Sequence, residues 1–356
     1  MARIELRKIA HSYLDRPAGP EDFAVKELDL TWDDGGAYAL LGPSGCGKTT
    51  LLNIISGLLT PSRGDVVFDD RTVTQERPEQ RNIAQVFQFP VIYDTMTVRQ
   101  NLAFPLKNRG VANDEIVARV AEIAQMIDLE GVLDRKARNL SADQKQKISL
   151  GRGLVRSDVN AILFDEPLTV IDPHLKWQLR SQLKKLHREF AFTMVYVTHD
   201  QTEALTFADK VVVMYEGEVV QIGTPEDLFE RPMHTFVGYF IGSPGMNVAP
   251  VSIEGNRAIL GGHAIELAFG YPDAPVGATI ELGTRPEFIR FVGNGVAADE
   301  NGLPVTVKRI DDIGRFKVAK VELGGVPLAV VADEDTVIDG VEARIAFDPD
   351  HVHIYA

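Results

Sequence analysis

An eight-residue stretch, GPSGCGKT at 42–49, constrains the fold of this chain more than any other feature. It lies between the apolar run YALL and a segment of helical character that begins at about Lys48. Glycines at 42, 45 and 47 allow successive backbone N–H groups to curl into a nest, and a helix N-terminus adds positive potential at the same place. The stretch therefore predicts a strand, a loop and a helix that together bind the phosphates of a nucleotide.

The residue types in this loop also predict how the nucleotide is held. Lys48 is expected to reach the β- and γ-phosphates, and the Thr49 hydroxyl is expected to bind Mg²⁺, which makes ATP and Mg²⁺ the predicted cofactors. The only cysteine, Cys46, is interpreted as a small filler of the loop and not as a nucleophile. The other residues predicted to surround the phosphates are Gly42, Pro43, Ser44, Gly45, Gly47 and Thr50.

Composition excludes several classes of protein. A chain of 356 residues is long enough for two domains. Its net charge of −14 argues against a nucleic-acid partner, because phosphate backbones attract basic surfaces. A single cysteine excludes an internal disulfide and fits a reducing compartment. The sequence contains no apolar run long enough to span a bilayer and no signal-peptide pattern at its start, so the expected location is cytosolic.

The pattern of apolar residues predicts an α/β layer fold up to about residue 235. Helical spacing recurs from about Asp114 to Leu129, and a further helix is expected from Ser141 to about Val155. Three β-branched runs, AILF, TMVYVT and KVVVMY, are apolar at consecutive positions. Such runs are typical of strands buried on both faces of a parallel sheet.

Beyond about Thr235 the helical periodicity disappears, and short strand-like runs follow one another between turns. Their spacing favours a small all-β barrel of roughly 110 residues. We therefore expect two domains, at 1–235 and 236–356. The strand-like runs are RAIL, HAIEL, ATIEL, FIRFV, PVTVKRI, FKVAKVEL, PLAVVA and ARIAF.

Polar residues stand where two of the predicted strands end, which is where ligands bind in open parallel sheets. Asp165 and Glu166 follow AILF, and His199 follows TMVYVT. Asp165 is predicted to hold Mg²⁺ through water, and Glu166 to activate the attacking water as a general base. His199 is predicted to contact the γ-phosphate or that water. Taken alone, paired acidic residues at a strand end are more often solvent-exposed charges, and a single histidine there more often has a structural role. The phosphate loop in the same sequence favours the catalytic interpretation.

The order and spacing of six motifs resemble those of ABC transporter ATPases, in the carbohydrate-importer branch. The resemblance covers nearly the whole chain and implies a P-loop ABC nucleotide-binding domain with a helical subdomain, followed by a regulatory OB-like barrel. The overall sequence, including its unusual signature, also resembles those of ATPases from glycerol importers. The motifs are GPSGCGKTT, VFQFP, the stretch from Leu140 to Arg156, ILFDEP, LTVID and VTHDQTEAL.

The resemblance implies roles for further residues. Tyr13 resembles the aromatic residue that stacks on adenine, although a tyrosine at a strand edge is the alternative. Gln88 resembles the glutamine that binds Mg²⁺, senses the attacking water and communicates with the membrane subunit. Asp172 resembles the aspartate that contacts the opposite site of a dimer, and Ser141 and Gln144 resemble the residues that face a γ-phosphate bound by the other subunit.

The same resemblance implies partners. The apolar segment FQFPVIYDTMTVRQNLAFPL around Gln88 would receive a cytoplasmic helix of a transmembrane permease, although by itself it is as typical of a buried core. The chain would then be the energy-coupling ATPase at the cytoplasmic face of the inner membrane. A second ATPase subunit and, indirectly, an extracytoplasmic solute-binding protein are implied. The implied cargo is a sugar, a polyol such as glycerol, or a related solute.

One motif departs from the family pattern. The signature Leu-Ser-Gly-Gly-Gln is replaced by Leu140, Ser141, Ala142, Asp143 and Gln144. A carboxylate beside a phosphate is repelled, so the altered signature favours a dimer with a non-identical ATPase that carries a standard signature. The alternative is that Asp143 turns away from the nucleotide and strengthens its own helix start.

Two other classes of function compete with an importer ATPase. A soluble ABC ATPase that acts on nucleic acid or ribosomes usually carries a coiled coil, zinc-binding cysteines or two cassettes, and none of these is present in the sequence. A nucleotide-dependent regulator would have no use for Glu166 and His199.

Overall fold

The computed structural model describes residues 2–169, 171–268, 279–292, 302–336, 338 and 341–356. Its internal contacts separate into two compact units, one up to Pro225 and one from Glu226 onward. The sequence placed the boundary at 235/236, after the short helix α8 (Pro225–Glu230) and at the start of α9 (Thr235–Phe240). None of the helices in the described part of the chain is long and apolar enough to cross a membrane.

The first unit is built around a six-stranded sheet with the strand order β10-β9-β3-β8-β7-β6. All neighbouring strands are parallel except β10, which forms an antiparallel hairpin with β9. The three predicted runs become β7, β8 and β9, and the residues of β8 are buried along its whole length. The strands are β3 (Ala37–Leu41), β6 (Ile83–Val86), β7 (Ala161–Asp165), β8 (Met194–Thr198), β9 (Lys210–Tyr215) and β10 (Glu218–Gly223).

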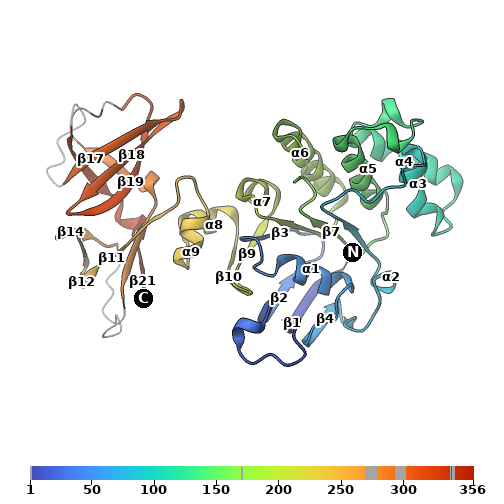
Figure 1. Ribbon diagram of the computed structural model, residues 1–356, viewed down its shortest axis with the longest axis horizontal. Helices are drawn as coiled ribbons and strands as arrows, with labels where there is room; N and C mark the ends of the chain where they lie inside the picture. The colour runs from blue at the N-terminus through green and yellow to red at the C-terminus, as the bar shows by residue number, and fades with distance from the viewer. Residues whose placement is uncertain (1, 170, 269–278, 293–301, 337, 339–340) are drawn as a thin grey trace. The chain divides into compact units, whose positions relative to one another are not determined.

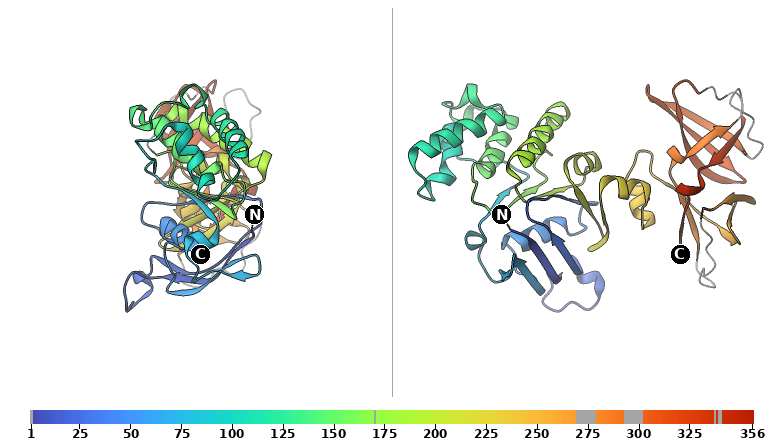
Figure 2. Two further views of the ribbon diagram at one scale, coloured as in Figure 1. Left: turned by 90° about the vertical axis from the view of Figure 1, so that its right-hand side faces the viewer. Right: turned by 180° about the vertical axis from the view of Figure 1, so that it is seen from behind.

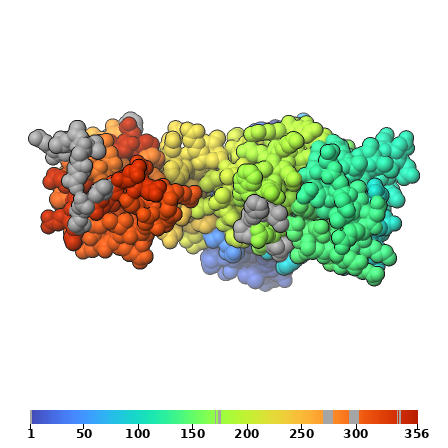
Figure 3. Space-filling model, turned by 90° about the horizontal axis from the view of Figure 1, so that it is seen from above, coloured from blue at the N-terminus to red at the C-terminus, as the bar shows by residue number. Residues whose placement is uncertain are grey.

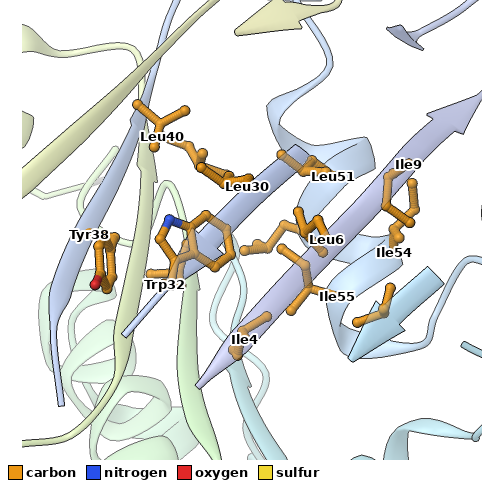
Figure 4. Close-up of a cluster of buried hydrophobic side chains, with 14 of the residues drawn as sticks. Ile4, Leu6, Ile9, Leu30, Trp32, Tyr38, Leu40, Leu51, Ile54 and Ile55 are labelled. Atoms are coloured by element: carbon orange, nitrogen blue, oxygen red, sulfur yellow. The ribbon is translucent and has the colours of Figure 1, made fainter. Parts of the chain in front are cut away.

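A second, antiparallel sheet of the first unit has the order β2-β1-β4-β5. Helix α1 (Lys48–Ser56) lies between the two sheets in opposite views of the molecule (Figures 1 and 2). Its Leu51, Ile54 and Ile55 pack with Trp32 and Leu40 in one apolar cluster (Figure 4). This core fixes the loop that precedes α1. The strands are β1 (Ile4–His11), β2 (Val25–Trp32), β4 (Arg63–Phe68) and β5 (Arg71–Thr72).

Helices α3, α4 and α5 of the first unit pack against one another beside the six-stranded sheet. Residues of α4 and α6 line a shared groove, and residues 98–154 lie beside those of α6 in the space-filling view (Figure 3). Both predicted helices are confirmed, as α4 and α5. Val117 stands at an apolar position of the helical pattern of α4 but is exposed, and it borders a shallow hollow between α3 and α4. The helices are α2 (Pro78–Arg81), α3 (Val98–Lys107), α4 (Asn113–Met126), α5 (Ala142–Leu154), α6 (Pro173–Phe190) and α7 (Gln201–Phe207).

The described part of the second unit is all-β apart from α8, α9 and two 3₁₀ turns, and it has an apolar core of its own. A five-stranded sheet has the order β16-β20-β17-β18-β19, and β16 also contacts β19, as expected of a small barrel. Two three-stranded sheets adjoin it, with the orders β11-β15-β21 and β12-β13-β14. The predicted strand at 278–282 begins at Ala278, which lies outside the described residues.

The strands of the second unit are β11 (Asn247–Pro250), β12 (Ser252–Glu254), β13 (Arg257–Leu260), β14 (His263–Glu266), β15 (Glu281–Thr284), β16 (Ile289–Val292), β17 (Leu303–Asp312), β18 (Phe316–Leu323), β19 (Val326–Asp333), β20 (Glu342–Phe347) and β21 (His353–Tyr355). The 3₁₀ turns among the described residues are Pro20–Asp22, Glu130–Val132, Ala137–Asn139, Pro286–Phe288 and Pro349–His351.

One arginine explains why α8 and α9 belong to the second unit. The guanidinium of Arg285 is buried and donates hydrogen bonds to the carbonyl oxygens of Leu228 and Phe229 in α8. It also donates to Gly238 in α9 and to Ile241, directly after α9. Carbonyl groups at a helix end have no partner within the helix, so a buried arginine that reaches them ties both helices to the β-structure.

Candidate functional site

Three loops that carry predicted site residues meet at one edge of the six-stranded sheet. They follow β3, β8 and β7, which are neighbours in the sheet and run parallel. Parallel strands deliver their carboxyl ends to the same edge, so the phosphate loop, the Asp165–Glu166 pair and His199 come together there.

The loop between β3 and α1 has the backbone that its glycines predict. Gly45 and Gly47 have φ angles of 83° and 99°, a region that other residues rarely adopt. Lys48 is buried, and its Nζ donates to the carbonyl oxygens of Gly42 and Pro43, both at 2.8 Å. The loop therefore holds a positive charge at the N-terminus of α1, where an anion is favoured.

The cysteine of this loop is enclosed by it. Burial raises the pKa of the Cys46 thiol, so it stays protonated and unreactive at neutral pH. This environment supports the interpretation of Cys46 as a filler of the loop.

The Thr49 hydroxyl donates to Asp165 Oδ1 at 3.1 Å, which joins the start of α1 to the end of β7. Burial, helped by the negative charge of Glu166, raises the pKa of Asp165, while the Thr49 hydrogen bond and Lys48 oppose that shift. A carboxylate and a hydroxyl fit Mg²⁺, which usually binds one or two protein groups together with phosphate oxygens and water. The described residues form no group of three or more histidine, cysteine or acidic side chains that would hold a metal without such help.

Glu166 has an unusual backbone conformation and a histidine partner. Its φ angle is +46°, in the left-handed region that is costly for a residue with a side chain. Its Oε2 lies 3.1 Å from Nδ1 of His199 and accepts a hydrogen bond from the Thr169 hydroxyl at 3.3 Å. The strained turn thus aims the carboxylate at the end of the neighbouring strand, β8.

A buried glutamate that sequence reasoning missed supports the histidine. Glu203 of α7 is 3% exposed and accepts hydrogen bonds from Tyr196 at 3.1 Å and Thr198 at 2.9 Å. Its other oxygen pairs with Lys176 of α6 at 3.2 Å. Because Thr198 directly precedes His199, this network holds the turn that carries the histidine. The only sign of this role in the sequence was an acidic residue four positions after His199.

Tyr13 lies close to the start of α1. Its hydroxyl is 3.0 Å from the hydroxyl of Thr50, and its ring packs edge-on against His11. The tyrosine is nevertheless 65% exposed, so most of its ring surface is available for stacking with a planar group.

The other predicted residues lie on three further loops. Gln88 is half-buried in the loop after β6, and Asp172 is exposed just before α6. Ser141 caps α5 by accepting from the Gln144 backbone at 3.3 Å, while Gln144 Oε1 accepts from the Ser141 backbone at 3.3 Å. These two reciprocal hydrogen bonds form a capping box at the start of α5. One residue of the motif LTVID, Val170, lies outside the described residues.

The altered signature shows how Asp143 is oriented. Its Oδ1 is buried and has no hydrogen-bond partner among the described residues. At least one oxygen of this carboxylate is therefore covered by its own chain and does not face open solvent at the start of α5.

A row of exposed apolar side chains follows β6. Phe87, Phe89, Val91 and Tyr93 are each between 36% and 69% exposed. Phe87 and Val91 border a hollow of about 280 Å³ between β6, α3 and α5. Arg152, which also lines this hollow, has its guanidinium 4.8 Å from the centre of the Tyr93 ring. The first part of the apolar segment, up to Tyr93, is therefore surface, whereas its second part, in α3, contributes Val98, Leu102 and Leu106 to the core.

A phosphate loop at the end of β3, beside an acidic pair and a histidine at the ends of β7 and β8, defines a P-loop nucleotide-binding protein. Residues 25–169 match the ABC transporter family. Similarity to curated relatives extends over the whole length, and the chain belongs to this family, as its sequence motifs indicated.

Three curated relatives illustrate the similarity. The sn-glycerol-3-phosphate import ATP-binding protein UgpC of Cupriavidus pinatubonensis is 40% identical over 100% of this chain and 97% of its own. The sulfoquinovosyl glycerol transport ATP-binding protein SmoE of Agrobacterium fabrum is 38% identical over 100% and 98%. The trehalose/maltose import ATP-binding protein MalK of Thermococcus litoralis is 38% identical over 93% of both chains.

A solved structure agrees with the fold of the first unit. The cbiO1 protein of Clostridium perfringens, part of the ABC transporter complex cbiONQ, superposes with a TM-score of 0.58 at 27% identity. It covers 64% of this chain and 90% of its own. The chain is thus an ATP-binding subunit of the importer type, an ATPase that uses ATP and Mg²⁺ at the cytoplasmic face of the membrane.

Proposed function

We propose that this chain drives solute import by hydrolysing ATP at the edge of the sheet where β3, β7 and β8 end. One observation carries the proposal: Glu166 Oε2 and His199 Nδ1 lie 3.1 Å apart, beside the Thr49–Asp165 hydrogen bond. A base, an orienting histidine and a pair of metal-binding oxygens thereby stand next to a buried lysine at a phosphate loop.

Each side chain has a distinct role in this proposal. Lys48 and the backbone of residues 42–50 bind the phosphates, and Tyr13 stacks on the base of the nucleotide. Thr49 and Asp165, with Gln88, hold Mg²⁺, which neutralises phosphate charge when bound. Glu166 accepts a proton from the attacking water at Oε2. His199 orients that carboxylate through its Nδ1. Its other ring nitrogen, Nε2, would contact the γ-phosphate.

The solute class is proposed from the relatives. Two of the three named above act on glycerol-linked solutes and the third on disaccharides. What these solutes share is several hydroxyl groups, so we propose a glycerol-linked or sugar solute for this importer. Selection takes place in the permease and the solute-binding protein, with which ATP-binding subunits of importers work.

The permease is proposed to dock on the exposed row that begins at Phe87. A helix that lays apolar side chains into the hollow beside this row would cover Phe89 and Val91. The row continues directly from β6 and flanks Gln88, so a docked helix would reach the loop that carries a proposed Mg²⁺ ligand. Neither a nucleic-acid ATPase nor a pure regulator would need this apolar surface.

The second ATP-binding subunit is proposed to place its signature against the nucleotide of the first. The sequence alone favoured a non-identical partner because Asp143 would repel a phosphate. The buried Oδ1 of Asp143 instead supports a pair of identical copies, in which this carboxylate is turned toward its own chain.

The substitution Glu166→Gln tests the catalytic role and the dimer together. It removes the base but keeps the shape, so ATP binding should remain while turnover falls by roughly 10²–10⁴-fold. Stalled ATP should then hold two subunits together, and the mass of the purified variant measured by light scattering should double with ATP and Mg²⁺.

Turnover within threefold of the unaltered chain would remove Glu166 from the role of base. A variant that binds ATP and stays monomeric would require a non-identical partner and restore the phosphate-facing interpretation of Asp143.

A further inference from the structure

Gln146 is the most deeply enclosed polar side chain of α5 among the described residues, with 1% of its surface exposed. Its Nε2 donates to the carbonyl oxygen of Pro167 at 2.6 Å and, with a longer contact of 3.4 Å, to that of Phe87. One amide group therefore joins α5 to two loops that follow separate strands of the six-stranded sheet.

The two acceptors adjoin proposed site residues. Pro167 directly follows Glu166, and Phe87 directly precedes Gln88. Glu166 has a left-handed backbone that needs support from its surroundings, and Thr169 supplies part of it by donating to the Glu166 carbonyl at 3.1 Å. The Gln146 amide supplies a second restraint, from outside the turn.

The helix that carries Gln146 also carries the signature. Ser141 and Gln144 lie at its N-terminus, where the partner subunit's nucleotide is proposed to sit. Gln146 is two residues beyond Gln144 in the same helix. The Gln146 amide thereby links this helix start to the backbone beside both Glu166 and Gln88.

The carbonyl oxygen of the Gln146 side chain, Oε1, argues against a role that consists only of filling space in the core. Its Oε1 is buried and has no hydrogen-bond partner among the described residues. A buried acceptor without a donor lowers stability, and a methionine of similar length would fill the same space without that cost. The donor nitrogen is therefore the useful part of this side chain.

We propose that Gln146 is a positioning residue that couples the signature end of α5 to Glu166 and Gln88 of the same subunit. The inference rests on the proposed function, because it takes the roles of those two residues from it. Gln146 itself touches backbone only and is not assigned a chemical step.

Two substitutions in the full-length chain test this proposal. Gln146→Met keeps the length and removes both the donor and the unpaired acceptor, so the two effects on stability oppose each other and the thermal midpoint should change little, while kcat falls about three- to tenfold with KM for ATP unchanged. Gln146→Glu replaces the donor with a carboxylate that faces two carbonyl oxygens, and kcat should fall further. Gln125→Met, on the exposed face of α4, is the matched control and should leave kcat unchanged.

A role in packing alone would give a different result. The thermal midpoint of Gln146→Met would fall and kcat per folded molecule would stay within twofold of the unaltered chain, which would overturn the proposal. If that variant does not fold, Gln146→Leu takes its place, and failure of both to fold would also show that Gln146 is structural.

Glu166→Gln, assayed in parallel, separates the two proposals. Loss of turnover in Glu166→Gln with normal kcat in Gln146→Met rejects the coupling role alone. Normal turnover in Glu166→Gln rejects the proposed function itself.

Discussion

At the scale of single residues, the site at the edge of the sheet contains a carboxylate that is costly to ionise. Burial and the neighbouring charge of Glu166 raise the pKa of Asp165 above its usual value. A folded state with a raised pKa binds a proton more readily than the unfolded chain does. The cost is therefore absent below the unfolded pKa, grows as pH rises from the unfolded pKa to the folded pKa, and is complete above the folded pKa.

The substitution Asp165→Asn removes that cost together with a proposed metal ligand. Without nucleotide at pH 7, the variant should unfold at the same or a higher temperature than the unaltered chain, and the difference should shrink as pH falls toward 4. In the presence of Mg²⁺, ATP at a concentration of about 100 times its Kd should raise the free energy of unfolding of the unaltered chain by about 2.7 kcal/mol. In the variant, ATP with Mg²⁺ should stabilise the protein no more than ATP alone does.

Thermal unfolding with ATP, with and without Mg²⁺, measures this difference. An equal Mg²⁺-dependent shift in both proteins would place the metal elsewhere.

At the scale of secondary-structure elements, the short helix α7 supports the site through one buried charge. Glu203 receives hydrogen bonds from β8 and an ion pair from α6, so it holds three elements in register. Breaking a buried pair by removing one partner leaves the other charge uncompensated, which is why such a contact is costly to disturb even when its net contribution is small.

We expect Glu203→Gln to lower the free energy of unfolding by about 1–3 kcal/mol, because a neutral amide cannot balance Lys176. Turnover should also fall, since Thr198 loses an acceptor that fixes the turn before His199. Denaturant unfolding and steady-state ATPase activity measure the two effects. Glu122→Gln is the matched control: it removes the partly exposed Arg119–Glu122 pair of α4 and should cost about 0.2–1 kcal/mol.

Equal losses of stability in the two variants would mean that Glu203 behaves as an ordinary surface charge. Normal turnover in Glu203→Gln would show that the hydrogen bonds of Glu203 do not control the position of His199.

Helix α5 shows why two glycines occur inside a helix. A Cβ on Gly151 would lie 2.6 Å from Leu102 of α3, and a Cβ on Gly153 would lie 2.9 Å from Val86 of β6. Glycine costs helix stability, but here it allows α5 to approach both neighbours closely.

At the scale of the whole molecule, the chain consists of two units with separate apolar cores. Every candidate for contact with the nucleotide lies in the first unit. The proposed role of the second unit is regulatory, and α8 and α9 go with it because Arg285 is bonded to their carbonyl oxygens.

A chain that ends at Pro225 should therefore fold and bind ATP with a Kd within about threefold of the full-length value, since it keeps the site and its core. A chain that ends after Phe240 carries α8 and α9 without Arg285 and should expose apolar surface and aggregate more readily. Calorimetric titration with ATP and light scattering measure the two outcomes. Failure of a folded 1–225 chain to bind ATP would place part of the site in the second unit.

Much of the site could be predicted from the sequence because its determinants are local. Three glycines, a lysine and a threonine within 42–49 specify a phosphate loop through backbone freedom and charge, whatever lies around it. Runs of apolar residues identified β7 and β8, and polar residues directly after them had to emerge at the same edge. The capping box of Ser141 and Gln144 depends on only four consecutive residues.

Contacts between distant segments were decided only by the tertiary structure. No local pattern shows that Gln146 meets Pro167 and Phe87, that Glu203 pairs with Lys176, or that Arg285 holds two helices. Each contact joins groups that are separated along the chain and become neighbours only when the sheet orders its strands. The direction of the Asp143 carboxylate is of the same kind: charge predicts repulsion from a phosphate, but packing around α5 determines which way the side chain faces.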